Sequence, residues 1–255
     1  MRALPLLAKA AFWLAVASLV VILSAGFGKQ LGLWSLGFAL MGVLPAGVLI
    51  GMIAVAVGAV WLVWSRFADN RANSLYGWAG LVGAIAVIAI PVHAAYVGYT
   101  MPPINDITTD TEHPPQFKAL LPLRRDATTS PQYPGGETLT WQGEKVTWAE
   151  AQKLAYPDIR TYRAFTTPDK LFELALAAAK DMGWQIVAAD KKEGRIEATD
   201  TTFFFGFTDD IVIRVAPSGE GAKLDIRSKS RVGISDVGAN AARIRDYIKT
   251  LEGTS

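Results

Sequence analysis

The sequence predicts two parts of different fold class. The first is an α-helical membrane region of about three transmembrane helices, and the second is an α+β two-layer domain with a mostly antiparallel sheet. Two observations lead to this prediction: charged residues are scarce before residue 100, and short runs of alternating polar and apolar residues follow residue 159. We expect a transmembrane region at 1–100, a proline-rich irregular segment packed on the domain at 101–158, and the α+β domain at 159–255.

The two parts differ sharply in charge. Five basic residues and one acidic residue stand in 1–100, which leaves 20 basic and 22 acidic residues for 101–255. The net charge of +2 is therefore +4 on the apolar part and −2 on the polar part. No basic stripe stands apart from acidic residues, so the charge pattern excludes a nucleic-acid binder. With no cysteine and only His93 and His113 as histidines, disulfides and cysteine-based sites are excluded, and we expect no metal or cofactor.

Three segments are long and apolar enough to cross a bilayer. About 20 apolar residues span the hydrocarbon core, because each helical residue rises 1.5 Å. Residues 10–27, 31–64 and 77–99 meet this condition. The second segment is longer than one span needs. It is either one tilted helix, kinked at Pro45, or an interfacial piece at 31–38 followed by a span near 40–63.

Two features of these segments allow a functional or an ordinary interpretation. Gly47 and Gly51 are spaced so that another helix can approach closely, although membrane helices are rich in glycine in any case. Apart from its tyrosines, the third segment has His93 as its only ionisable side chain. It is either a proton or ligand site inside the membrane or a residue near the outer end, within reach of water.

Basic residues near the spans predict the orientation. Arg2 and Lys9 precede the first span, and Arg66 and Arg71 lie between the second and third. With three spans, these four residues are on one side and Lys29 is on the other. Because basic residues favour the cytoplasmic side, we expect a cytoplasmic N-terminus and an extracytoplasmic domain. The first span is interpreted as an uncleaved anchor, not a signal peptide.

The polar part predicts helices at both ends of a sheet. Prolines interrupt 101–160, where a short helix is expected at 148–155. Thr167, Pro168 and Asp169 are typical of a helix start, and Gly183 is typical of its end. Strands are expected at 184–189, 195–201, 210–216 and 222–232, and short turns make them antiparallel. A final helix is expected from about Val237, capped by Ser235 or Asp236. This order predicts a two-layer sandwich.

The last predicted strand has the least common pattern, because its charged residues alternate with apolar or small ones. These charged residues are Lys223, Asp225, Arg227, Lys229 and Arg231. The alternation is typical of the solvated face of a half-buried sheet. Carboxylates of Asp200, Asp209 and Asp210 on neighbouring segments can instead form charge-assisted pairs with the arginines. Such a cluster either stitches the sheet together or lines a polar site.

Two further segments leave alternatives open. Residues 203–207 contain four aromatic side chains, which either form a surface that faces a ligand or the membrane or close one end of the core around Gly206. Residues 235–240 lead into the last helix. They are either ordinary capping residues or an anion site with Arg231 nearby.

Three segments resemble the signature of domain-of-unknown-function family 1499. They are the run RSKSRVGISDVGAN at 227–240 followed by Arg243 and Ile244, the element FTDD at 207–210, and NDITTD at 105–110 with Pro114 and Pro115. The resemblance covers about 100–252. The motif positions that it implies are Asp106, Asp110, Asp209, Asp210, Arg227, Ser228, Ser230, Arg231, Gly233, Asp236, Gly238, Asn240 and Arg243. Ala241 stands where the family has an arginine.

The resemblance implies membership and no particular reaction, and relatives with a membrane-spanning N-terminal half occur in bacteria. Our first hypothesis is therefore a binding or assembly module at the outer face of a bacterial cytoplasmic membrane. Its partners would be the lipid bilayer and an anionic lipid head group or envelope protein. The ligand-binding candidates are Asp106, Asp110, Asp209, Asp210, Arg227, Ser228, Ser230, Arg231, Asp236, Asn240 and Arg243. The ligand and the oligomeric state stay open.

Two other hypotheses come from different classes. The chain is an enzyme if Asp209 and Asp210 do acid–base work or hold Mg²⁺ or Ca²⁺. Adjacent strand residues point to opposite faces, so this would need a bulge or turn. Alternatively, the motif maintains the fold, and the function lies in the membrane helices.

Overall fold

The computed structural model describes residues 3–67 and 74–253. Arg2, Asp69 and Arg71, on which part of the predicted orientation depends, lie outside the described residues. The chain forms two compact units. Unit 1 comprises Met1–Tyr96 with Phe203–Gly206, and unit 2 comprises Val97–Thr202 with Phe207–Ser255.

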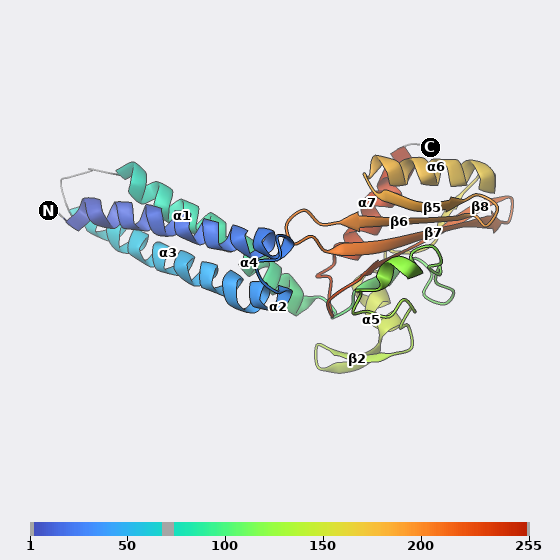
Figure 1. Ribbon diagram of the computed structural model, residues 1–255, viewed down its shortest axis with the longest axis horizontal. Coiled ribbons are helices and arrows are strands. Elements are labelled where there is room, and N and C mark those ends of the chain that lie inside the picture. The colour runs from blue at the N-terminus through green and yellow to red at the C-terminus, as the bar shows by residue number, and fades with distance from the viewer. Residues whose placement is uncertain (1–2, 68–73, 254–255) are drawn as a thin grey trace. The chain divides into compact units, whose positions relative to one another are not determined.

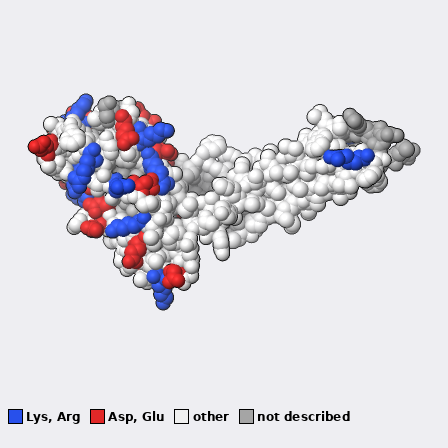
Figure 2. Space-filling model, turned by 180° about the vertical axis from the view of Figure 1, so that it is seen from behind, with Lys and Arg blue, Asp and Glu red and all other residues white. Residues whose placement is uncertain are grey.

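Unit 1 is built from long apolar helices. Its elements are α1 (Ala3–Gln30), the short α2 (Leu36–Phe38), the π-helical η1 (Ala39–Val43), α3 (Leu44–Phe67) and α4 (Ser74–Thr100), whose last four residues fall in unit 2 (Figure 1). The helical runs Leu4–Gln30, Leu36–Phe67 and Ser74–Thr100 have the length and apolar composition of membrane spans. On the face in Figure 2, charged side chains crowd unit 2, whereas the helices of unit 1 are nearly free of them. The predicted membrane region of three helices is confirmed.

The second span is one helical run with a local irregularity. Turn residues occupy 31–34, and helix runs without a break from Leu36 to Phe67. Pro45 has no N–H to donate, and its ring would clash with the carbonyl four residues earlier in a regular α-helix. The π-helix Ala39–Val43 lies at this position, and a π-turn widens the backbone there.

Small residues bring the helices of unit 1 close together. A Cβ atom added to Gly47 would lie 2.6 Å from Ile22 Cγ1 of α1, and Ser18 Oγ donates to the Gly47 carbonyl at 2.8 Å. A Cβ on Gly51 would meet Ser18 Oγ at 2.8 Å. The spacing of these two glycines therefore serves a close helix approach. Gly80 on α4 has the same role, because its Cβ would lie 2.5 Å from the backbone nitrogen of Phe12.

The aromatic segment 203–207 does not close the core of the α+β domain. Phe203–Gly206 belongs to unit 1, where the Gln30 side-chain amide donates to the carbonyls of Phe203 and Phe204 at 2.7 and 2.8 Å. A Cβ on Gly26 would lie 2.5 Å from the Phe204 carbonyl oxygen, so only glycine allows this approach. The segment therefore packs on the C-terminal turns of α1.

Unit 2 contains a six-stranded antiparallel sheet in the order β1-β8-β7-β6-β5, with β4 also paired to β8. The strands are β1 (Asp106–Thr108), β4 (Tyr162–Ala164), β5 (Gln185–Asp190), β6 (Arg195–Thr201), β7 (Thr208–Ser218) and β8 (Gly221–Ser230). The helices α6 (Pro168–Asp181) and α7 (Ala239–Gly253) cover one face (Figure 1). A separate hairpin, β2 (Thr138–Trp141) and β3 (Glu144–Thr147), leads into α5 (Trp148–Ala155). The predicted α+β fold is confirmed.

The predicted bounds of α5 and β6 agree with the structure, and Thr167 caps α6 by accepting from the Lys170 N–H. The prediction that strands begin only after residue 159 is wrong for β1 and for the β2–β3 hairpin. In addition, β4 was not anticipated. β1 and β4 have three residues each, which is too short for an alternating pattern. They are strands because the edge of β8 supplies their hydrogen bonds.

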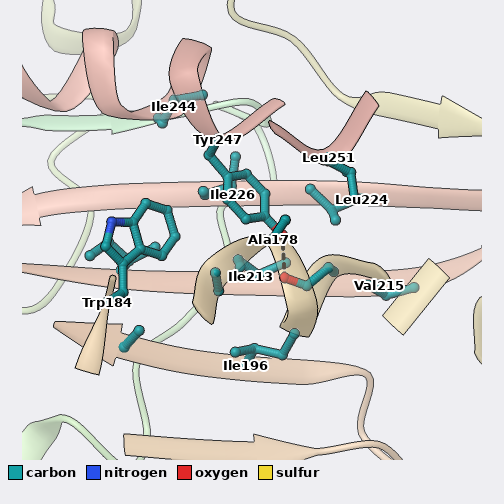
Figure 3. Packing of buried hydrophobic residues seen from close by; sticks show 14 of the residues in the cluster. Ala178, Trp184, Ile196, Ile213, Val215, Leu224, Ile226, Ile244, Tyr247 and Leu251 are labelled. Carbon is teal, nitrogen blue, oxygen red and sulfur yellow. Dashed lines mark hydrogen bonds between the residues drawn. The ribbon is translucent and has the colours of Figure 1, made fainter. Parts of the chain in front are cut away.

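The apolar core lies between the sheet and the two helices (Figure 3). Tyr247 of α7 stacks on Trp184 with ring centroids 5.1 Å apart, and its hydroxyl donates to the Ala175 carbonyl at 2.9 Å. The sheet contributes fully buried aliphatic side chains, among them Ile196, Ile211, Ile213, Leu224 and Ile226. Since these residues alternate along β6, β7 and β8, the intervening side chains point to the opposite face.

Candidate functional site

The opposite face of the sheet carries a buried layer of charge. Cross-strand register places Asp225 beside Arg214, Arg227 beside Val212 and Lys229 beside Asp210. The segment 110–133, which includes η2 (Leu121–Arg124), covers this face, and Phe117 and Leu120 pack on Val212. Arg227 is 0% exposed and Lys229 only 3%. The interpretation as a solvated face is therefore wrong, because the irregular segment excludes water.

Asp106 on β1 pairs with two of the buried cations. Arg227 Nε and Nη2 donate to its two carboxylate oxygens at 2.8 Å each, and Lys229 Nζ donates at 2.8 Å. The remaining Arg227 donors reach the carbonyls of Pro115 at 3.2 Å and Pro131 at 2.8 Å. Burial lowers the pKa of Lys229, and the charge of Asp106 opposes that shift. The pairing meets the condition for a tolerated buried charge, namely a partner and hydrogen bonds.

Asp210 on β7 pairs with two arginines. Arg231 Nη2 lies 2.7 Å from Asp210 Oδ1, and Arg124 Nη1 donates to Oδ2. Burial lowers the pKa of Arg124 below its usual value, although the charge of Asp210 opposes the shift. The Arg231 side chain is 21% exposed and is the most open of these groups. Arg124 was not anticipated, because nothing in the proline-rich segment marks it as a partner for a strand residue.

Glu197 on β6 is a second residue that the sequence pattern missed. Its carboxylate accepts the backbone N–H groups of Lys118 at 3.0 Å, Ala119 at 3.0 Å and Leu120 at 2.9 Å. These three donors belong to the turn that enters η2. A fully buried carboxylate therefore fastens the covering segment to the sheet.

A second polar cluster lies on the helix-covered face, at the end of the sheet. Arg243 of α7 donates to Asp200 Oδ2 at 2.9 Å and to Asp209 Oδ2 at 2.7 Å. Its Nη1 also donates to Asn240 Oδ1 at 2.8 Å. Arg243 therefore joins the last helix to β6 and β7.

Asn240 joins the same helix to β8. Its Oδ1 accepts from Ser228 Oγ at 2.6 Å, and its Nδ2 donates to Ser230 Oγ at 3.0 Å and to the Asn105 carbonyl at 3.1 Å. Asn240 and Ser228 are fully buried, and Ser230 is 7% exposed. The serines of the motif are therefore partners of the asparagine that follows them.

Asp236 caps α7. Its carboxylate accepts the N–H groups of Gly238 at 2.8 Å and Asn240 at 2.9 Å. Burial raises the pKa of Asp236 above its usual value, although these two hydrogen bonds oppose the shift. The helix N-terminus is thus occupied by a side chain of the protein, which favours the capping interpretation over an anion site.

The two adjacent aspartates do not converge. Asp209 contacts Arg243 on one face, and Asp210 contacts Arg231 on the other, because the β6–β7 register is regular there. Asp110 stands apart and pairs with Arg214 at 3.0 Å. Among residues 3–67 and 74–253, no group of three or more His, Asp or Glu is placed to hold a metal ion.

The stretch of chain that contains these clusters matches a known protein family. A family model described as "Protein of unknown function (DUF1499)" matches residues 106–251. The chain belongs to this family. No curated protein matches the sequence. The DUF1499 domain thus includes β1, the covering segment, the whole sheet and most of α7.

The DUF1499 domain also has two open pockets. One, of about 340 Å³, lies beside β4 and the C-terminal half of α7. The other, of about 220 Å³, lies between Pro114–Pro115 and strands β6 and β7. Neither pocket is lined by any of the eleven predicted ligand-binding residues.

Proposed function

We propose that the chain is an integral protein of a bacterial cytoplasmic membrane, with its N-terminus in the cytoplasm. Its DUF1499 domain is then a binding module on the outer face, and it contacts the lipid surface through the loop 231–238. One observation carries this proposal: the Asp236 N–H donates to the Ile104 carbonyl at 3.1 Å.

That bond ties the loop to the end of a membrane span. α4 ends at Thr100, only four residues before Ile104. Four extended residues cover at most about 14 Å, so the loop backbone cannot lie far from the end of the span. Asn105 strengthens the tie, because its side chain donates to the Gly233 carbonyl. Trp141 donates to the Thr100 carbonyl at 3.1 Å, and tryptophan is typical of membrane–water interfaces.

The exposed chemistry of the loop suits an anionic lipid surface. Ile234 is 80% exposed and Val237 is 41% exposed, which is costly in water but favourable among lipid head groups. Arg231 stands at the start of the same loop and is the least buried of the motif cations. A cation near anionic lipid contributes about 1 kcal/mol. The buried motif residues would then support this loop, and the partly exposed Arg231 would contact lipid.

A spin label tests the proposed contact. Because the chain has no cysteine, Ile234→Cys gives a single labelling site without background. In nanodiscs with anionic lipid, we expect the label to be accessible to oxygen and shielded from a water-soluble relaxation agent. Lys192→Cys, on the turn between β5 and β6, is the matched control and should show the reverse. Equal solvation of the two labels would refute the lipid contact.

A second candidate function assigns only a structural role to the motif and leaves the activity to the membrane helices. The complete burial of the Asp106–Arg227 pair favours it. The same label distinguishes the candidates. If Arg231→Gln leaves the depth of the label at residue 234 unchanged in anionic and zwitterionic nanodiscs alike, Arg231 has no lipid role and the structural candidate is preferred.

A further inference from the structure

The outer edge of β8 has a gap. β1 pairs with residues 227–229 of β8, and β4 pairs with residues 222–224. Between them, side chains and loops take the place of a strand: Thr161 Oγ1 donates to Asp225 Oδ1 at 2.6 Å, and the Thr109 N–H donates to the Ile226 carbonyl at 2.9 Å. The pocket of about 340 Å³ is lined by both threonines and by α7.

The pocket combines an apolar wall with an excess of positive charge. Ile159, Ile244 and Ile248 form the apolar part. The charged lining residues are Arg160, Arg163, Arg245, Lys249, Asp158 and Glu252, which leaves two positive charges in excess. This volume is at the lower end of the range for small-molecule sites, which are mostly apolar with a few polar groups.

Two of the four cations are already engaged. Arg245 holds Asp158 through two hydrogen bonds of 2.6 and 2.8 Å, and its guanidinium lies 5.4 Å from the Tyr156 ring centroid. Arg163 Nη1 donates to Ser218 Oγ at 2.5 Å.

Arg160 and Lys249 differ from those two. Within the described part of the chain, neither side chain makes a hydrogen bond or an ion pair. Arg160 acts on Asp158 only through its charge. The pKa of Asp158 is lowered mostly by the hydrogen bond from Arg245, and the charge of Arg160 is the smallest of the causes that lower it. Their donors are therefore available to a ligand.

We propose that this pocket binds a small organic phosphate monoester that carries a ring or short apolar chain. The apolar group lies against Ile244 and Ile248, and the anionic group accepts hydrogen bonds from Arg160 and Lys249. The pocket shares no residue with the loop 231–238. The inference therefore does not rest on the proposed lipid contact, and either can fail without the other.

Isothermal titration calorimetry of the full chain in a nonionic detergent tests the site. Phenyl phosphate is the probe, because it has both the ring and the anion and partitions poorly into micelles. Inorganic phosphate has only the anion, and benzyl alcohol has only the ring. We expect phenyl phosphate to bind at least tenfold more tightly than either.

Charge-neutral variants locate the binding. Arg160→Gln and Lys249→Gln should each weaken phenyl phosphate binding about tenfold. Lys192→Gln removes the same charge at the turn between β5 and β6, at the edge of the sheet opposite to β4, and should leave binding unchanged. Circular dichroism establishes that each variant is folded. The proposal is overturned if phenyl phosphate does not bind, if inorganic phosphate or benzyl alcohol binds as tightly, or if the three variants behave alike.

Discussion

Asp106 and Arg227 form a two-point ion pair in which neither side chain is exposed to solvent. The pair joins β1, at the start of the DUF1499 domain, to β8 near its end. The Phe117 ring centroid lies 4.7 Å from the guanidinium carbon, so the covering segment closes over the pair. One ion pair therefore holds together three segments that are distant in sequence.

Removal of one partner of the Asp106–Arg227 pair should lower the free energy of unfolding far more than loss of a surface carboxylate. Asp106→Ala leaves Arg227 and Lys229 charged and buried, and loss of one partner of a buried pair costs about 3–5 kcal/mol. We expect that loss in the free energy of unfolding by chemical denaturation in detergent. Asp126→Ala, an exposed aspartate of the covering segment, is the control and should unfold like the parent chain. Equal stability of the two variants would contradict this account.

Glu197 should control how firmly the covering segment is held. Glu197→Ala leaves three backbone N–H groups without their acceptor, and each hydrogen bond to a charged group contributes about 1.5–3 kcal/mol. We expect faster tryptic cleavage at Lys118 and Arg125, measured by mass spectrometry of the fragments. Glu144→Ala, on the exposed hairpin, should not change the cleavage rate. Cleavage at the parental rate in Glu197→Ala would show that the segment is held by other contacts.

The helix packing of unit 1 predicts opposite outcomes for two glycines of α4. Gly80→Ala puts a methyl group 2.5 Å from the Phe12 backbone nitrogen, so the helices must separate at a cost of about 1–3 kcal/mol. Gly83→Ala meets no atom within 4 Å and should be neutral or slightly stabilising. Thermal unfolding in detergent, followed by circular dichroism, distinguishes them. A similar melting temperature for both variants would rule out the close approach.

Val237 has a backbone φ of 55°, a conformation that is unfavourable for a β-branched residue. Such strain costs about 1–3 kcal/mol. We expect Val237→Gly to raise the free energy of unfolding by about 1 kcal/mol and Val237→Ala to change it less. Under the proposed function, the same Val237→Gly change should reduce lipid contact, because an exposed apolar side chain is lost. A destabilised Val237→Gly variant would show that the valine side chain contributes packing that outweighs the strain.

Asp110 predicts an acid-dependent part of the stability. Burial raises its pKa, but hydrogen bonds from the His113 and Glu112 N–H groups and from Arg214 together lower the pKa below the ordinary value. A carboxyl with a lowered folded pKa stabilises the fold above its unfolded pKa, near 4, and loses that contribution as the pH falls further. Unfolding free energies measured between pH 3 and 7 should therefore depend less on pH in Asp110→Asn. An unchanged pH dependence would contradict this role.

The sequence by itself determined the features that depend on neighbouring residues. Hydropathy alone located the three apolar helices, since a spanning helix satisfies its own backbone within one segment. Local signals located α5, α6 and the strands β5 to β8, because such signals lie next to the element they mark, as Thr167 does to the residues it caps. The motif also pointed to the residues that form the two polar clusters.

Only the tertiary structure decided what those residues do. The charged face of β8 looks solvated in sequence, and it is buried because a segment about a hundred residues earlier in the chain folds over it. Arg124 and Glu197 gained their partners in the same way. β1 and β4 became strands by pairing with β8. Burial and pairing depend on which distant segments meet in space, and a local pattern carries no record of that meeting.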